Sequence, residues 1–147
     1  MKIAFAADHA GVELKNALLA DARAAGLTVI DLGGNDPRAA DDYPDYAASA
    51  AQSLRSGAAE RAVVVCGSGV GVTVAANKHA GVRAGLCHDT YSAHQGVEHD
   101  DMNVLCLGAR IIGVELAREI ARAFLGARFS GDARHLRRLA KVLALDG

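Results

Sequence analysis

Side chains able to bind an anion or move a proton follow several short apolar segments of this 147-residue chain. They are Asp8 and His9, Cys66, His88 and Asp89, and Arg110. A thiol or an imidazole can act as a general base, and a guanidinium can hold an anionic ligand. The carboxyl ends of parallel strands meet at one edge of a sheet, where ligands bind in such folds. The spacing therefore predicts that these groups share one site.

A glycine-rich turn follows Cys66, in the segment CGSGVGVTVAANK of residues 66–78. Its glycines allow positive φ and let the backbone approach a ligand closely, and successive N–H groups at a helix start form an anion-binding concavity. The helix dipole favours the thiolate form of a cysteine placed there, so Cys66 is a candidate base or nucleophile. The alternative is a small buried strand residue, which is common for cysteine. We expect that role for Cys87 and Cys106.

Known phosphate-binding motifs do not match this turn. A dinucleotide fingerprint needs glycine at position 72, and a cysteine-phosphatase loop needs arginine there, but the residue is Val72. A Walker A loop needs lysine directly after its last glycine, and here Lys78 comes later. Asp89 lies about where a ribose-binding acid would be, so a nucleotide-binding function stays open.

Histidines and arginines give weaker signals. His88, His94 and His99 do not follow a recognised metal-ligand spacing, so we expect no metal site and favour surface positions for His79, His88 and His94. Arg134 and Arg138 share one face of a predicted helix and could hold a phosphate between them. A solvated basic face explains the same spacing equally well.

Apolar periodicity indicates how these groups are positioned. It predicts strands at 2–7, 27–32, 61–66, 82–87 and 103–107, and helices at 11–25, 44–57, 71–80, 90–99, 113–126 and 133–145. Near-continuous apolar strands are typical of parallel sheets buried on both faces. We therefore expect an α/β fold: a three-layer sandwich with a five-stranded parallel Rossmann-like sheet and an extra C-terminal helix. Residues 33–43 form the longest predicted loop.

Composition limits the partners of the chain. Its length favours a single domain over residues 1–147. The formal net charge of −1 argues against nucleic-acid binding, whereas a basic segment at 110–141 favours a small anionic ligand. No apolar stretch is long enough to span a membrane, and no signal-peptide pattern opens the chain. The odd count of three cysteines favours free thiols and a cytoplasmic location.

Several segments together resemble the ribose-5-phosphate isomerase type B family and its galactose-6-phosphate isomerase relatives. The matching segments are AADHAG (6–11), DYPDYA (42–47), residues 66–78, YSA (91–93), residues 99–113 and ARHLRR (133–138). The resemblance implies aldose–ketose isomerisation of a sugar phosphate without a metal or organic cofactor. The expected reaction interconverts D-ribose 5-phosphate and D-ribulose 5-phosphate, with allose or galactose 6-phosphate as alternatives. It also implies a homodimer, or a tetramer, whose sites are shared between chains.

The resemblance also assigns roles to residues. Cys66 would be the base that moves a proton between C1 and C2, and His99 the acid/base that opens the sugar ring. The substrate-binding residues would be Asp8, His9, Gly67, Ser68, Gly69, Val70, Gly71, Asp100, Arg110, Arg134 and Arg138. Within this set, the backbone of residues 67–71 would stabilise enediolate oxygens, and the three arginines would hold the phosphate. One subgroup uses a glutamate in the helix after the glycine-rich turn, but residues 71–73 here contain no acid.

Two departures from the family pattern bear on the substrate. The family usually has asparagine after the histidine, where this chain has Asp100, and a carboxylate opposes a developing negative charge that an amide would stabilise. Near the C-terminus, Arg137 is an adjacent alternative to Arg138 for the phosphate. A second hypothesis is therefore a non-catalytic module that binds a phosphorylated metabolite or nucleotide on the same fold.

Overall fold

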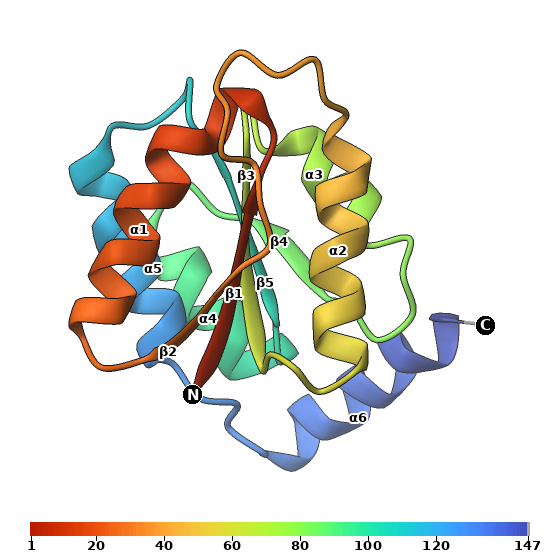
Figure 1. The fold of residues 1–147 in the computed structure, drawn as a ribbon. Coiled ribbons are helices and arrows are strands. Elements are labelled where there is room, and N and C mark those ends of the chain that lie inside the picture. The colour runs from red at the N-terminus through yellow and green to blue at the C-terminus, as the bar shows by residue number, and fades with distance from the viewer. Residues whose placement is uncertain (147) are drawn as a thin grey trace.

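The computed structural model describes residues 1–146, which form one parallel sheet between two layers of helices (Figure 1). The strands β1 (Lys2–Ala7), β2 (Thr28–Asp31), β3 (Arg61–Cys66), β4 (Ala84–Leu86) and β5 (Val104–Gly108) lie in the order β2-β1-β3-β5-β4. The helices are α1 (Val12–Ala24), α2 (Tyr43–Arg55), α3 (Val70–Ala76), α4 (Thr90–Asp100), α5 (Val114–Gly126) and α6 (Ala133–Leu143), with short 3₁₀ turns η1 (His9–Gly11) and η2 (Ala144–Asp146). The predicted three-layer α/β sandwich is confirmed.

Alternate residues of the central strands face two separate cores. Phe5, Val65 and Leu105 face one side, where they pack with apolar residues of α1, α4 and α5. Small residues such as Ala4 and Val64 face the other side, where α2 and α3 supply mainly alanine and valine. Such small side chains let these two helices lie close to the sheet. Because β1, β3 and β5 are buried on both faces, their sequences are continuously apolar.

Differences from the predicted boundaries fall at the sheet edges. The edge strands β2 and β4 are shorter than predicted and partly exposed. The helix predicted at 71–80 ends as α3 at Ala76, because the side chain of Asn77 is bonded to the edge strand instead. Its amide donates to the Ala84 carbonyl at 2.9 Å and accepts from the Ala84 N–H at 2.8 Å.

The order in which strands are added to the sheet changes direction between β1 and β3. It passes from β1 through α1 to the outer strand β2, and later from β3 toward β5 and β4 on the opposite side. At such a reversal, the helices that follow adjacent strands lie on opposite faces of the sheet and leave a crevice at the carboxyl ends. Asp8 and Cys66 lie at this crevice. Within residues 1–146, no helix is long and apolar enough to cross a membrane.

Candidate active site

A cavity of about 330 Å³ opens at the carboxyl ends of β1, β3 and β5. Eight residues line it: Asp8, Tyr43, Cys66, Gly67, Ser68, Gly71, Arg110 and Ile111. The structure thus brings together most of the sequence-predicted residues of the glycine-rich turn with the carboxylate of Asp8 and the guanidinium of Arg110. We refer to this group as the Cys66 cavity.

The turn after β3 orients the sulfur of Cys66. The Gly69 N–H donates to Cys66 Sγ at 3.1 Å, and the residue is only 4% exposed. Gly69 has φ +79°, and a Cβ there would lie 2.8 Å from the Leu107 backbone, so glycine is required at this position. A backbone N–H aimed at sulfur stabilises negative charge on it. Cys66 is therefore a sheltered thiol with a donor in place.

Arg110 is held beside this turn through its backbone. The Arg110 N–H donates to the Gly67 carbonyl at 3.0 Å, and the Ala109 N–H donates to the Cys66 carbonyl at 2.8 Å. The guanidinium lies over Gly67, where an added Cβ would be 3.4 Å from Nη1. The side chain is otherwise exposed. The cation therefore stands at the mouth of the cavity, where it can meet an anionic group of a ligand.

Tyr43 is a cavity residue that the sequence analysis missed. It is the first residue of α2, and its ring packs on Gly71, where a Cβ would lie 2.8 Å from the ring. The segment DYPDYA contains Tyr43, but the segment alone does not indicate which element its ring would meet. The tyrosine ring therefore forms part of the wall of the cavity.

His9 lies beside the Cys66 cavity rather than in it. It lines a neighbouring cavity of about 440 Å³ with residues of α1 and of the segment before α5. Its Nδ1 lies 2.7 Å from Asp41 Oδ1, and the Tyr46 hydroxyl donates to Asp41 Oδ2 at 2.8 Å. Burial raises the pKa of Asp41, but these hydrogen bonds outweigh it, so the pKa stays below its usual value. A charged Asp41 only accepts, so His9 Nδ1 carries a proton.

His99 and Asp100 lie at the opposite end of the sheet from the Cys66 cavity. The helix α4 begins after the carboxyl end of β4 and runs back along the sheet for 11 residues, a length of about 16 Å. Its last residues, His99 and Asp100, are thus near the amino ends of the strands. Within one chain, the imidazole of His99 is remote from the thiol of Cys66.

The His99 ring is held by contacts from two helices. Gln95 Nε2 lies 3.0 Å from His99 Nδ1, and the His99 ring stacks on the His135 ring of α6 at 4.1 Å between centroids. With the Gln95 amide as donor, a neutral His99 carries its proton on Nε2. His135, which the sequence analysis did not single out, is 1% exposed and bonded through Nδ1 to Ser130 Oγ at 2.6 Å.

Arg134 and Arg138 lie on α6 near His135, and so belong with His99 and Asp100. Burial lowers the pKa of His135, and the nearby charges of His99, Arg134 and Arg138 lower it further. Both arginines are exposed on α6, which packs against α4. The predicted site residues therefore form two groups: the Cys66 cavity with His9 alongside, and His99 with Asp100, Arg134 and Arg138 at the other edge.

The remaining candidates have local structural contacts. His88 Nε2 accepts from the Gly108 N–H at 3.1 Å, and Asp89 caps α4 by accepting from the Ser92 N–H at 2.6 Å. That hydrogen bond lowers the pKa of Asp89. Cys87 and Cys106 are buried in the core as predicted, and burial raises their pKa values to about 11 and about 12. Among residues 1–146, no cluster of three histidine, cysteine or acidic side chains is placed to hold a metal ion.

Comparisons with known proteins agree with this architecture. The family model described as Ribose/Galactose Isomerase matches residues 3–142. Ribose-5-phosphate isomerase B of Escherichia coli is 41% identical over 145 residues, covering 99% of this chain and 96% of that protein. D-Erythrulose-4-phosphate isomerase of Pectobacterium atrosepticum is 41% identical over 131 residues, covering 89% and 86%.

Solved structures show the same likeness over the whole chain. Ribose-5-phosphate isomerase B of Clostridium thermocellum matches with a TM-score of 0.95 and 38% identity, covering 99% of this chain and 97% of that one. The Mycoplasma genitalium enzyme with bound ribulose-5-phosphate matches with a TM-score of 0.93 and 37% identity, covering 99% and 95%. The chain therefore belongs to the ribose/galactose isomerase family and is a sugar-phosphate isomerase.

Proposed function

We propose that this isomerase interconverts D-ribose 5-phosphate and D-ribulose 5-phosphate, with Cys66 as the base that moves the proton between C1 and C2. The observation that carries the proposal is the sheltered sulfur of Cys66, bonded to the Gly69 N–H in a small cavity that also holds Asp8 and Arg110. The whole-chain likeness to ribose-5-phosphate isomerase B supports the choice of pentose.

The proton transfer follows from this arrangement. The Cys66 thiolate removes the proton from C2 of the open-chain aldose, and the electron pair of that C–H bond forms the C1–C2 double bond of an enediolate. Negative charge then develops on the C1 oxygen, where backbone N–H groups of residues 67–71 would stabilise it. A proton then passes from the C2 hydroxyl to the C1 oxygen, the thiol returns its proton to C1, and the ketone forms at C2. No electron leaves the substrate, so the step needs no redox partner.

A second chain would complete the site. Ribose 5-phosphate is a closed ring, which His99 would open by donating its Nε2 proton to the ring oxygen while a base takes the proton of the C1 hydroxyl. His99, Arg134 and Arg138 are too far from Cys66 in one chain, so we propose a homodimer in which each Cys66 cavity faces the second group of the other chain. Arg110 from one chain and Arg134 and Arg138 from the other would then hold the phosphate.

Exposed apolar side chains support this dimer. Around the Cys66 cavity, Val70, Val74 and Ile111 are each more than half exposed. On α6 only His135 is buried, and Leu136 is 51% exposed. Exposed apolar side chains that gather on one surface favour an interaction with another protein. Pairing α6 of one chain with α3 of the other would cover both surfaces and bring the two halves of the site together.

A tetrose 4-phosphate is the second candidate substrate. The D-erythrulose-4-phosphate isomerase relative is 41% identical to this chain, as ribose-5-phosphate isomerase B is, although the match covers 131 residues rather than 145. A tetrose 4-phosphate cannot close a furanose ring, because its C4 oxygen carries the phosphate, so it needs no ring opening. Asp100, in place of the asparagine usual in the family, lies in the group that would open a ring. Turnover of hexose 6-phosphates remains an untested prediction. Membership of an isomerase family argues against the second hypothesis, a non-catalytic binding module.

The test is isomerisation by the purified protein with EDTA present. We expect turnover of D-ribose 5-phosphate that is insensitive to EDTA and is lost in Cys66→Ala, while the variant still binds the substrate. Turnover of D-erythrose 4-phosphate but not of D-ribose 5-phosphate would show that the substrate is the tetrose phosphate. Near wild-type turnover in Cys66→Ala would show that Cys66 is not the base. With three free thiols, we also propose that the enzyme works in the reducing cytoplasm.

A further inference from the structure

The turn that follows His99 and Asp100 has an unusual backbone conformation. Asp101 has φ +50°, and it is the one non-glycine residue with positive φ among residues 1–146. Asp101 and Met102 end α4 by donating their N–H groups to the carbonyls of Val97 and Gly96, both at 3.1 Å. A left-handed conformation is costly for a residue with a side chain and persists where neighbouring contacts hold it.

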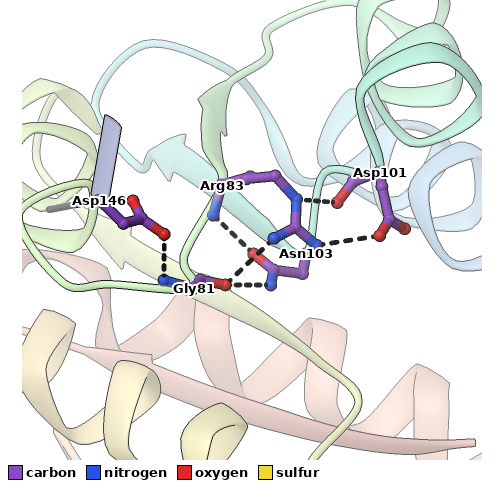
Figure 2. Close-up of polar contacts among 5 residues, drawn as sticks. All are labelled: Gly81, Arg83, Asp101, Asn103 and Asp146. Carbon is purple, nitrogen blue, oxygen red and sulfur yellow. Dashed lines mark hydrogen bonds and ion pairs between the residues drawn. The ribbon is translucent and has the colours of Figure 1, made fainter. Parts of the chain in front are cut away.

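Arg83 binds both the backbone and the side chain of Asp101 (Figure 2). Its Nε donates to the Asp101 carbonyl at 2.7 Å, and its Nη2 donates to Asp101 Oδ2 at 3.0 Å. The Arg83 side chain is 18% exposed and that of Asp101 is 42% exposed, so the guanidinium is the sheltered partner of the pair. A planar guanidinium fork fixes direction as well as distance, which an ammonium cannot do.

Asn103 holds the backbone of the segment that carries Arg83. The Arg83 N–H donates to Asn103 Oδ1 at 2.8 Å, and Asn103 Nδ2 donates to the Gly81 carbonyl at 2.9 Å. Arg83 Nη1 lies 3.3 Å from that same carbonyl, and the Gly81 N–H donates to Asp146 Oδ2 at 2.8 Å. Figure 2 shows these residues converging from the turn before β4, the end of α4 and the C-terminal η2. One polar network therefore joins the end of α4 to the segment that follows α6.

The backbone at Asp101 decides where the residues before it point. His99 and Asp100 directly precede the turn, and the contacts of the His99 ring come from helices, at Gln95 and His135. A change at Asp101 would let the last turn of α4 unwind and would shift the His99 ring on its stack. A displacement of about 1 Å in a reacting group is enough to cost about 100-fold in rate.

We propose that Arg83 is a positioning residue for His99, because it holds Asp101 in the left-handed conformation that ends α4. This inference rests on the proposed role of His99 in opening the sugar ring. Arg83 lies in the network and not in the Cys66 cavity. Its loss should therefore impair ring opening and leave the proton transfer at Cys66 intact.

The experiment compares net isomerisation with proton exchange. D-Ribulose 5-phosphate is an open chain, so exchange of its C1 hydrogen with deuterated water needs Cys66 but no ring opening, and NMR measures it. In Arg83→Met, we expect isomerisation of D-ribose 5-phosphate to fall about 10- to 100-fold while the exchange stays near the wild-type rate. His99→Asn should give the same signature. Both rates are divided by the folded fraction of each variant, measured by circular dichroism, so that a loss of folded protein does not count as a loss of either reaction.

Further variants keep the test independent of stability. Asp101→Gly adopts the left-handed conformation without strain but lacks the carboxylate, and should show a weaker form of the same split. Asp101→Asn keeps an acceptor and should retain most of the isomerisation. Arg118→Met is the matched control: it loses ion pairs with Asp21 and Glu115 on an exposed surface, and both rates should stay unchanged. Equal losses of exchange and isomerisation in Arg83→Met, or no loss at all, would overturn the proposal.

A second readout separates this inference from the proposed function. The imidazole signals of His99, assigned by their absence in His99→Asn, should shift or broaden in Arg83→Met while those of His9 stay in place. A wild-type protein with no activity on any sugar phosphate would refute the proposed function only. An unchanged His99 signal in Arg83→Met would refute the positioning role whatever the activity.

Discussion

At the scale of single residues, the surroundings of the proposed base Cys66 differ from those of the two other cysteines. All three cysteines are buried in the core clusters, but the sulfur of Cys66 accepts from the Gly69 N–H and Cys66 lines a cavity. Burial raises the pKa of Cys87 to about 11 and that of Cys106 to about 12. Both core thiols are therefore protonated at neutral pH, and a protonated thiol is a poor nucleophile.

Alkylation should thus be selective. At pH 8, we expect iodoacetamide to modify Cys66 first and to abolish isomerisation in step with that modification. The substrate should protect Cys66, while Cys87 and Cys106 react only after unfolding. Peptide mapping by mass spectrometry measures each site. Inactivation that follows Cys87 or Cys106 instead would contradict the assignment of the base.

Asp100 offers a second test at this scale. A carboxylate near a developing enediolate opposes its charge, and an amide can donate to it. We expect Asp100→Asn to raise kcat on D-ribose 5-phosphate by about tenfold. Steady-state kinetics on D-ribose 5-phosphate and D-erythrose 4-phosphate compare the two substrates, and a gain on the tetrose alone would show that Asp100 does not limit the pentose reaction.

At the scale of elements, the sequence predicted the sheet well and the contacts between helices poorly. The apolar periodicity of residues 2–7 and 61–66 reproduces β1 and β3, because both strands are buried on both faces. The packing of Tyr43 on Gly71 and the stack of His99 on His135 were not predictable. Each joins elements that are distant in the sequence, and neither leaves a periodic pattern.

Lys15 makes another contact that the sequence pattern did not predict. Periodicity places it on α1, yet its side chain is fully buried. Its Nζ donates to Asp31 Oδ1 at 2.8 Å and to Asn35 Oδ1 at 2.9 Å, and so anchors the start of the loop at 33–43 to α1. Burial raises the pKa of Asp31, but the hydrogen bonds from Lys15 and Gly33 outweigh it and leave the pKa below its usual value.

This ion pair predicts a stability that depends on pH. Because the folded-state pKa of Asp31 is depressed, its contribution is present above the unfolded pKa near about 4 and is lost as the pH falls below it. At pH 7, Asp31→Asn should be less stable than wild type by about 1 kcal/mol, since the carboxylate is partly exposed. Urea unfolding should show this difference shrinking toward pH 3. Asp21→Asn, which loses only an exposed pair with Arg118, is the control and should change little.

At the scale of the whole molecule, the sheet separates the two groups of the site. The sequence predicted one edge for Asp8, Cys66 and Arg110, and the structure brings these three together at the Cys66 cavity. His99 came from the family resemblance, and its place at the other edge follows from α4 running back along the sheet. Cys66 and His99 can therefore act together only across two chains, and we propose a site built from both.

Subunit mixing tests that claim most directly. Cys66→Ala and His99→Asn chains are each expected to have little activity alone on D-ribose 5-phosphate. In a mixed dimer, one site would combine an intact Cys66 from one chain with an intact His99 from the other. Unfolding and refolding an equal mixture should therefore restore about a quarter of the wild-type isomerisation, given random pairing. A mixture that stays as inactive as its components would show that Cys66 and His99 do not act across a dimer.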